Sequence, residues 1–496
     1  MTHPGADVVD RATLERAARR FGEAGIVLPT FAQLAEPQQI PDAALEGLSG
    51  AGRDDADARN LWRVHWYNDT LGGGQREVPE HVVLGPAFTG VPPQILVVFG
   101  DTFPMIGAHK VLAAYACLVP RLVTGGFDPT AQRAVWPSTG NYARGGVAIS
   151  RIMGCRGVAV LPENMSRERF DWLRRWVSDP ADIVVTPGSE SNVKEIYDAC
   201  AEIAADDRNV IFNQFSEFSN HVGHYAVTGP ALEHAFESRS AVEPGLRLAA
   251  FVAASGSSGT LGAGDYLKER YGSATVAVEA LECPTMLYNG FGEHNIQGIG
   301  DKHIPLVHNV MNNDAAVAVS DAATDGLFLA FGHEDGRRLL AGRGVPADVL
   351  ASLEHFGLSS ICNVLAAVKY ARAAGLGSDD VVVTVATDGA AMYDSERPRI
   401  GTGRFGGSFD GAGAAAQIEE HLAGADTSHV ELLDDVGRSR IFNLGYFTWV
   451  EQQGVPLEDF EARRGAAFWD RLHAMAPAWD AMIDDFNARS GAVIGG

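Results

Sequence analysis

Short apolar runs rich in β-branched residues alternate with helical patterns between about residues 90 and 395. Runs such as "ILVVF" and "VVVTVA" have the continuous apolar character of strands that are buried on both faces of a parallel sheet. The predicted strands lie at residues 94–100, 157–162, 183–187, 209–213, 248–255, 274–280 and 381–387. So many strands separated by helices predict an α/β protein with two sheets.

The chain on either side of this region has a different pattern. Residues 1–85 begin with an amphipathic helical pattern around "ATLERAARRF" and continue into a stretch rich in Gly, Asp and Ala. Residues 400–425 are rich in Gly and Ala and predict a mobile loop. Residues 440–490 return to a helical pattern that holds three tryptophans. We therefore expect an N-terminal extension (1–85), a core (86–400) and a C-terminal helical extension (401–496).

Composition and charge narrow the classes of partner. The longest apolar runs are far shorter than the ~20 residues that span a bilayer, and no secretory signal is visible at the N-terminus. The net charge of −24 opposes binding to a nucleic-acid backbone. The five cysteines are scattered without a CxxC pair, which is typical of reduced thiols. We expect a cytoplasmic protein that binds neither nucleic acid nor membrane.

Lys110, in "MIGAHKVLAAY", is one of only five lysines against 34 arginines. Arginine could supply a positive charge there, but its guanidinium group stays protonated and cannot form an imine. Lys110 is therefore a candidate for covalent chemistry. The alternative is a structural lysine in the first turn of a helix.

Three further stretches place small polar residues at the ends of strands or helices. "PSTGNYARGG" precedes a helical pattern and suits a carboxylate at the helix N-terminus, although Ser138 or Thr139 could simply cap that helix. "ASGSSGTLGAGDYLKERY" (254–271) could wrap a phosphate with backbone amides, but it lacks the P-loop and dinucleotide-binding patterns. "TVATDGAAMY" ends a strand at Thr387 and Asp388, where an acidic residue is often only a cap.

Together and in this order, these stretches resemble the tryptophan synthase β / cysteine synthase family of pyridoxal-phosphate enzymes (fold type II). "GAHK" is identical to the stretch that carries the Schiff-base lysine in tryptophan synthase β chains. "LPENMSRER", "GSSGTLGAGDYLKE", "HNIQGIG" and "GLSSICNVLAAVK" are similar to stretches of the cysteine synthases. The matches run from about residue 105 to 393 and leave both ends of the chain without a counterpart.

The resemblance implies two three-layer α/β/α domains with helical extensions at both ends. Within the core, it implies a mobile substrate subdomain at 155–205 and a phosphate-binding domain at 210–395. A homodimer and a small amino-acid substrate are also implied. The tryptophan-rich C-terminal segment is then expected to cover the active-site mouth or to form the dimer interface.

Lys110 is implied to form the internal aldimine with pyridoxal 5'-phosphate and, once freed by substrate, to remove the α-proton. Asn141 is implied to bind the ring hydroxyl of the cofactor, and His109 either donates to the phosphate or only packs. The residues implied to cradle the phosphate are Gly256, Ser257, Ser258, Gly259 and Thr260. Those implied to hold the substrate are Ser138, Thr139, Gly140, Gln214 and Gly298.

The partner of the pyridine nitrogen is ambiguous. Our alignment of "ATDGAAMY" with the family places Asp388 there, and a slip of one residue places Thr387 there instead. A carboxylate would favour the protonated ring and widen the chemistry toward deamination, whereas a hydroxyl is the ordinary family solution. No metal site is expected, because His221 and His224 in "HVGH" have no evident third ligand.

The favoured function is β-elimination or β-replacement on a small amino acid through an aminoacrylate, as in cysteine synthases and cysteine lyases. A hydroxy-amino-acid dehydratase or an ammonia-lyase of the same fold is the nearest alternative. An alternative of another class is a regulatory or binding subunit without turnover, which the intact Lys110, Asn141 and phosphate loop oppose. Binding of a nucleotide by the "GSSGT" loop would leave the other matches unexplained.

Overall fold

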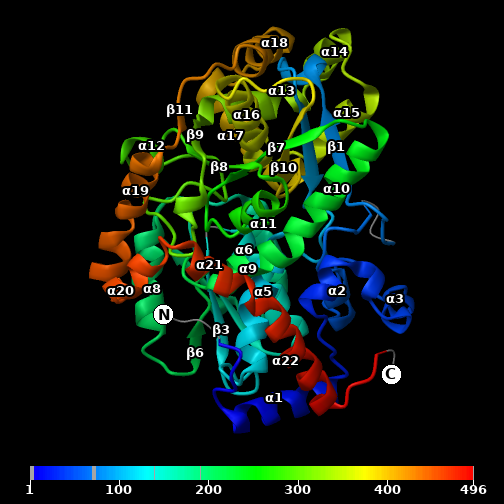
Figure 1. Cartoon of the computed structure of the whole chain (residues 1–496), viewed down its shortest axis with the longest axis vertical. Coiled ribbons are helices and arrows are strands. Elements are labelled where there is room, and N and C mark those ends of the chain that lie inside the picture. The colour runs from blue at the N-terminus through cyan, green and yellow to red at the C-terminus, as the bar shows by residue number, and fades with distance from the viewer. Residues whose placement is uncertain (1–4, 70–73, 139, 190, 495–496) are drawn as a thin grey trace.

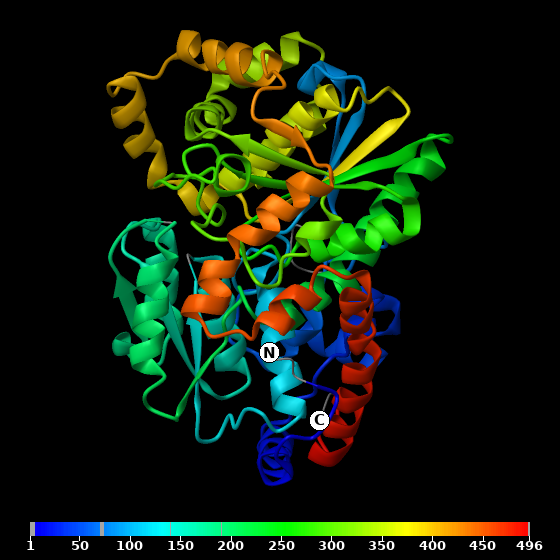
Figure 2. The ribbon, with the colours of Figure 1, turned by 60° about the vertical axis from the view of Figure 1, so that its left-hand side comes forward.

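The computed structural model describes residues 5–69, 74–138, 140–189 and 191–494 and forms two lobes, each built on one sheet (Figures 1 and 2). The larger sheet has the order β1-β2-β10-β7-β8-β9-β11. Its strands are β1 (His81–Leu84), β2 (Gln94–Phe99), β10 (Asp380–Ala386), β7 (Arg247–Ala254), β8 (Ala274–Ala280), β9 (Ala315–Val319) and β11 (Val430–Leu432). The smaller sheet has the order β5-β4-β3-β6, with β5 (Ile183–Thr186), β4 (Arg156–Pro162), β3 (Arg133–Pro137) and β6 (Asn209–Ile211).

The expected two-sheet α/β architecture is therefore confirmed, and every strand predicted from an apolar run is present. The smaller sheet is parallel throughout. In the larger sheet the five central strands are parallel, while β1 and β11 are antiparallel edge strands. These two strands belong to the expected extensions, which therefore complete the sheet. The sequence predicted none of β1, β3, β9 and β11, because each is short, and β3 and β9 also contain alanine, a poor strand former.

Successive side chains of the central strands point alternately into two separate hydrophobic cores. In β2, Ile95 and Val97 face one core, whereas Leu96 and Val98 face the other. Side chains of successive strand residues point to opposite faces, so both faces of a strand that is apolar throughout must be covered. Helices α13 (Asp321–Gly332) and α16 (Leu358–Ala373) cover one face, and α10 (Gly229–Val242) and α11 (Leu261–Tyr271) cover the other (Figure 1).

The remaining helices surround both sheets and join the lobes. Those of the central region are α4 (Pro86–Thr89), α5 (Lys110–Val123), α6 (Asn141–Ile152), α7 (Arg167–Trp176), α8 (Val193–Ile203), α9 (Phe218–Gly223), α12 (Thr285–Tyr288), α14 (Glu334–Gly342) and α15 (Ala347–Ser352). Those of the N-terminal region are α1 (Arg11–Ala24), α2 (Phe31–Ala35) and α3 (Asp42–Leu48). Those of the C-terminal region are α17 (Glu396–Phe405), α18 (Gly411–Gln417), α19 (Asp435–Leu444), α20 (Leu457–Ala462), α21 (Ala466–His473) and α22 (Met475–Ser490).

The prediction of a loop over residues 400–425 is wrong, because most of this segment is helical. Helix α18 continues into a π-helical turn at Ile418–Ala423. Ala414, Ile418 and Leu422 are fully buried in the core that covers the larger sheet. The small residues that suggested a loop instead let the helix pack closely against its neighbours.

The first and the last helix of the chain meet. Helices α1 and α22 lie side by side at the foot of the molecule (Figure 1), and the rings of Phe21 and Phe486 are 5.2 Å apart. The segment that contains α19 runs between the upper and lower lobes in Figure 2. Within the described residues, none of the helices has the length and apolar character needed to span a membrane.

Candidate active site

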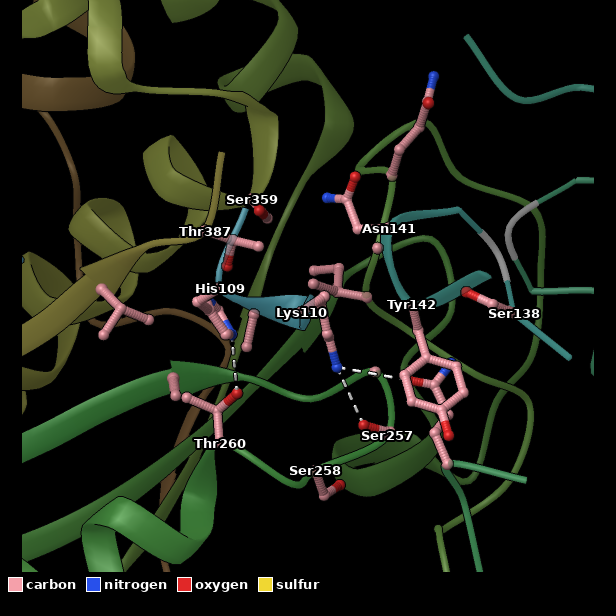
Figure 3. Close-up of a pocket in the computed structure, with 18 of the residues that line it drawn as sticks. His109, Lys110, Ser138, Asn141, Tyr142, Ser257, Ser258, Thr260, Ser359 and Thr387 are labelled. Atoms are coloured by element: carbon pink, nitrogen blue, oxygen red, sulfur yellow. Dashed lines mark hydrogen bonds between the residues drawn. The ribbon is translucent and has the colours of Figure 1, made fainter. Parts of the chain in front are cut away.

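Lys110 begins helix α5 and directs its amine into a pocket between the two lobes (Figure 3). Its Nζ lies 3.1 Å from Oγ of Ser257 and 3.4 Å from Oε1 of Gln214. Helix α6 reaches the start of α5 closely, since a Cβ on Gly145 would lie 2.9 Å from the Lys110 carbonyl oxygen. Glycine at 145 thus allows the two helix N-termini to meet beside the pocket.

The pocket favours the neutral form of this lysine. Burial lowers the pKa of Lys110 from its ordinary value of 10.5 to about 8, and the charge of Asp301 partly opposes the shift. Asp301 is buried and lines the same pocket. An amine with a pKa of about 8 is partly uncharged near neutral pH, and the uncharged amine can act as a nucleophile and then as a proton acceptor. Lys110 and Asp301 therefore supply an amine and a carboxyl group with acid–base capacity to the same pocket.

The loop between β7 and α11 has the form of an anion cradle. Ser258 adopts a left-handed conformation (φ 64°), which turns the chain sharply before the helix. In the described residues, the backbone N–H groups of Gly256, Ser257, Ser258, Gly259 and Thr260 make no hydrogen bond to protein atoms. A Cβ on Gly256 would lie 2.5 Å from the carbonyl oxygen of Gly298, so only glycine fits there. Free amides at a helix N-terminus match the needs of a phosphate.

His109 lies at the edge of this cradle, where Nε2 is 3.4 Å from Oγ1 of Thr260. Its ring stacks on Trp66 at 5.3 Å, so the N-terminal region positions it. Burial lowers the pKa of His109 to about 3, which keeps the ring neutral. Nδ1 is buried without a hydrogen-bond partner in the described part of the chain. The neutral ring can offer one N–H to an anion in the cradle.

The loop before α6 forms the opposite wall of the pocket. Ser138 lines the pocket, and its Oγ accepts a hydrogen bond from the N–H of Gly140 at 2.9 Å. Thr139 lies outside the described residues. Asn141 also lines the pocket, and its Nδ2 donates to Oδ2 of Asp388 at 2.7 Å. The other proton on Nδ2 is available to a ligand hydroxyl.

Thr387 and Asp388 have different surroundings. Thr387 lines the pocket together with Ser359, as Figure 3 shows. Asp388 is fully buried beside the pocket and does not line it. Burial raises the pKa of Asp388, although Arg169 and the donors around its carboxylate oppose the shift. Of the two, Thr387, the residue of the slipped alignment, is thus the one whose side chain lines the pocket.

Asp388 instead anchors a polar network between the lobes. Its Oδ2 lies 3.5 Å from Nη2 of Arg169 and 3.0 Å from the hydroxyl of Tyr393. Arg169, from α7, also donates to the Tyr393 hydroxyl at 2.9 Å and to Gln297. Every charge in this group is buried and paired, so the network fixes how the lobes meet.

Several pocket residues were not predicted from the sequence. Asp301, Gln297, Ser359 and Asn363 supply polar atoms to the walls. Asn363 ties two strand ends together, since it accepts from the N–H of Ala254 and donates to the carbonyl of Val385. Gly298 and Gln214 line the pocket, as the resemblance implied. Asp301 could have been suspected from its place directly after "QGIG", where an acidic residue follows a turn.

Comparison with known proteins supports the same interpretation. The family described as "Pyridoxal-phosphate dependent enzyme" matches residues 94–337. A probable cysteine synthase of Bacillus subtilis is 28% identical over 298 residues, which cover 59% of this chain and 86% of that protein. A cysteine synthase of Staphylococcus aureus is 30% identical over 261 residues, which cover 52% of this chain and 74% of that protein.

Solved structures share the fold at lower identity. A hydrogen sulfide-producing enzyme of Fusobacterium nucleatum superposes with a TM-score of 0.53 at 20% identity, covering 66% of this chain and 98% of that one. An O-acetylserine dependent cystathionine β-synthase of Helicobacter pylori gives a TM-score of 0.51 at 22% identity, covering 64% of this chain and 94% of that one.

The two-lobed α/β fold, the pocket lysine and the anion cradle define a cofactor-dependent enzyme of amino-acid chemistry. The chain belongs to the pyridoxal-phosphate dependent enzyme family. The residues present fit pyridoxal phosphate, because free loop amides lie on one side of the Lys110 amine and polar donors lie on the other. The cofactor of this enzyme is pyridoxal 5'-phosphate.

Proposed function

We propose that this enzyme catalyses β-elimination or β-replacement on a small amino acid, as a cysteine synthase or a cysteine lyase does. The observation that carries the proposal is the position of the Lys110 amine. It lies between Ser257 of the phosphate loop and Gln214 of the substrate side, and the Asp301 carboxylate lines the same pocket. When bound, pyridoxal phosphate withdraws electrons from Cα of the amino acid.

The protein's residues then bind, orient and move protons. Lys110 would hold the cofactor through its amine and would take the α-proton in its neutral form. The amides of residues 256–260 and the hydroxyl of Thr260 bind the phosphate, with His109 beside them. Ser138, Gly140, Gln214 and the N-terminus of α6 bind the substrate carboxylate. Asn141 orients the ring hydroxyl, Gly298 leaves space at the reacting carbon, and Thr139 stays a predicted substrate contact.

Thr387 supports β-chemistry over the deaminase alternative. A hydroxyl facing the pyridine nitrogen leaves it neutral, so the ring stabilises less negative charge and favours loss of a β-substituent. Asp388 would protonate the ring, but it accepts hydrogen bonds from Asn141 and Tyr393 outside the pocket wall. Loss of water from a hydroxy-amino acid is itself loss of a β-substituent, so this geometry disfavours the ammonia-lyase alternative but does not separate the dehydratase, which the choice of substrate must distinguish.

Asp301 narrows the choice of leaving group. A carboxyl group beside the lysine can protonate a departing group in its acid form, and as a carboxylate it can accept a proton from an attacking thiol or water. Cysteine and O-acetylserine are the substrates that suit this arrangement. The names of the relatives, cysteine synthase and hydrogen sulfide-producing enzyme, support these two compounds.

Absorbance spectroscopy tests the proposal. Purified wild type is compared with Lys110→Ala, and cysteine, O-acetylserine and serine are then added in turn. We expect a visible cofactor band in wild type that the variant lacks, and a spectral shift with cysteine or O-acetylserine. A shift with serine alone would favour the dehydratase instead. A colourless wild type that takes up no added pyridoxal phosphate would overturn the enzyme proposal.

We further propose that the enzyme works in the cytoplasm as a homodimer, with residues 155–205 moving over the substrate. Exposed apolar side chains in and beside the C-terminal region support an interface, since Phe291, Val436 and Phe447 are 79%, 76% and 69% exposed. Light scattering after size-exclusion chromatography tests this, and a mass of one chain would contradict it.

A further inference from the structure

A cluster of three metal-binding side chains lies outside the active site, where the C-terminal extension meets the core. His221 comes from α9, Asp265 from α11 and His473 from α21. The three helices lie together near the centre of Figure 1. All three side chains are buried, and their ligand atoms lie within 4.8 Å of one another.

The distances within the cluster match those of a tetrahedral metal site. The two Nε2 atoms of His221 and His473 are 3.1 Å apart. Oδ2 of Asp265 lies 3.3 Å from Nε2 of His221 and 3.8 Å from Nε2 of His473. Zinc–ligand distances of about 2.0–2.2 Å put tetrahedral ligand atoms roughly 3.3–3.6 Å apart. A single ion at the centre would therefore reach all three atoms.

The carboxylate of the cluster also has the supporting hydrogen bonds of a metal ligand. Nδ2 of Asn309 and Nδ2 of Asn312 donate to the two oxygens of Asp265 at 2.7 and 2.6 Å. Behind His473, Oε1 of Glu269 lies 3.4 Å from Nδ1, at ion-pair distance but without a hydrogen bond in the described residues, and Tyr225 donates to the other Glu269 oxygen at 2.6 Å. A metal-ligating histidine usually gives its second N–H to a carboxylate, and ligating carboxylates are themselves hydrogen-bonded.

The three-residue cluster opens on one side into a cavity, which gives an ion a path to the site and leaves room for a fourth ligand. Asp265 and His473 line a cavity of about 410 Å³, together with Glu269, Asp470, Asn309 and Asn312. Three carboxylates line this cavity (Asp265, Glu269 and Asp470) against two cationic side chains (Lys268 and Arg464), so the net charge of its wall attracts a cation. We propose that His221, Asp265 and His473 bind one zinc-class divalent ion, with a water from this cavity as the fourth ligand. Imidazole and carboxylate ligands in this geometry suit Zn²⁺ and its substitute Co²⁺ rather than Mg²⁺.

The ion would tie the C-terminal extension to the phosphate loop. His221 follows Asn220, whose Nδ2 donates to Ser257 Oγ at 3.1 Å and to the Gln214 carbonyl at 3.0 Å. Asp265 lies in the helix that begins directly after the loop. The site thus joins three segments that are remote in the sequence, and this explains why "HVGH" alone showed no third ligand: His224 instead bonds Thr228.

Metal binding to the holoenzyme tests the proposal. After dialysis against chelator, Zn²⁺ is titrated in competition with a chromogenic chelator, and Co²⁺ is added separately to record its ligand-field absorbance. We expect one Zn²⁺ per chain and a tetrahedral Co²⁺ spectrum. Zinc affinity should fall about 100-fold in His473→Gln and in Asp265→Asn, and about tenfold in Glu269→Gln.

His421→Gln, in the same extension but outside the cluster, should bind zinc like wild type. Thermal unfolding adds a second readout, in which Zn²⁺ raises the midpoint of wild type and of His421→Gln but not of His473→Gln. Zinc affinity and cobalt spectra that are the same in wild type and His473→Gln would overturn the proposal. So would a wild type that binds no zinc in competition with the chelator.

Discussion

Asn141 and Asp388 are joined across the two lobes by a hydrogen bond of 2.7 Å. The same carboxylate faces Arg169, and both charged side chains are fully buried. The Asp388→Asn substitution removes a negative charge from a paired, buried site, and such losses cost about 3–5 kcal/mol. We expect the free energy of unfolding to fall by about 3 kcal/mol, measured by urea denaturation.

Asp394→Asn is the matched control, because its carboxylate is 66% exposed and pairs only at the surface with Arg397. We expect it to change stability by less than about 0.5 kcal/mol. An Asp388→Asn protein as stable as this control would mean that the network does not hold the lobes together.

Thr387 rather than Asp388 is expected to tune the cofactor. Thr387→Val keeps the shape of the side chain and removes the hydroxyl that lines the pocket. Loss of one hydrogen bond of about 1.4 kcal/mol should lower kcat roughly tenfold and shift the visible band of the bound cofactor. Asp388→Asn should leave the position of that band unchanged. The reverse pattern of band shifts would show that Asp388 faces the pyridine nitrogen.

Cofactor uptake should depend on pH through Lys110. Its pKa is lowered from 10.5 to about 8 by burial, and only the neutral amine attacks the cofactor aldehyde. The rate of uptake by cofactor-free enzyme should therefore rise as pH increases toward 8 and level off above it. Stopped-flow absorbance measures this rate. A rate that keeps rising tenfold per pH unit up to pH 10 would show that the lysine is not shifted.

The lowered pKa of Lys110 also predicts the direction in which the stability of the protein changes with pH. The folded protein binds the proton on Lys110 less tightly than the unfolded chain does. The cofactor-free enzyme should therefore gain stability as pH rises from about 8 to about 10.5. Lys110→Met should lack this gain, and the comparison of the two proteins by denaturation at each pH removes the effects of other groups. If the stability of wild type and of Lys110→Met changed with pH in the same way, the lowered pKa of Lys110 would be contradicted.

Asp301 should be needed for turnover but not for cofactor binding. Asp301→Asn keeps the size of the side chain and removes its acid–base function, which is worth about 10²-fold or more in kcat. Sulfide release from cysteine measures turnover, and the visible band measures bound cofactor. Asp314→Asn, whose carboxylate pairs with Lys268 at 2.8 Å and lies outside the pocket, is the control. Equal turnover in both variants would remove Asp301 from the reaction.

The features that could be predicted from the sequence are those formed by residues close together along the chain. Lys110 and the loop at 256–260 each combine residue types that their chemistry requires within a few positions, so the pattern and the resemblance both pointed to them. Trp66 could not be assigned, because its role beside His109 arises only when distant segments meet. The third ligand of the histidine cluster was missed for the same reason, since His473 lies 252 residues after His221. The choice between Thr387 and Asp388 depends on a register of one residue, which the sequence alone does not determine.

During synthesis, helix α1 cannot complete its packing until α22 has been made. The backbone N–H of Leu28 donates to Asn487 across 459 residues, and Asn487 returns a hydrogen bond to the Leu28 carbonyl. At about 5–20 residues per second, a ribosome needs roughly 20–90 s to make the intervening chain. Throughout that interval the apolar face of α1, which includes Phe21, is not yet covered by α22. The N-terminal helix is therefore the segment that a chaperone has the longest opportunity to bind.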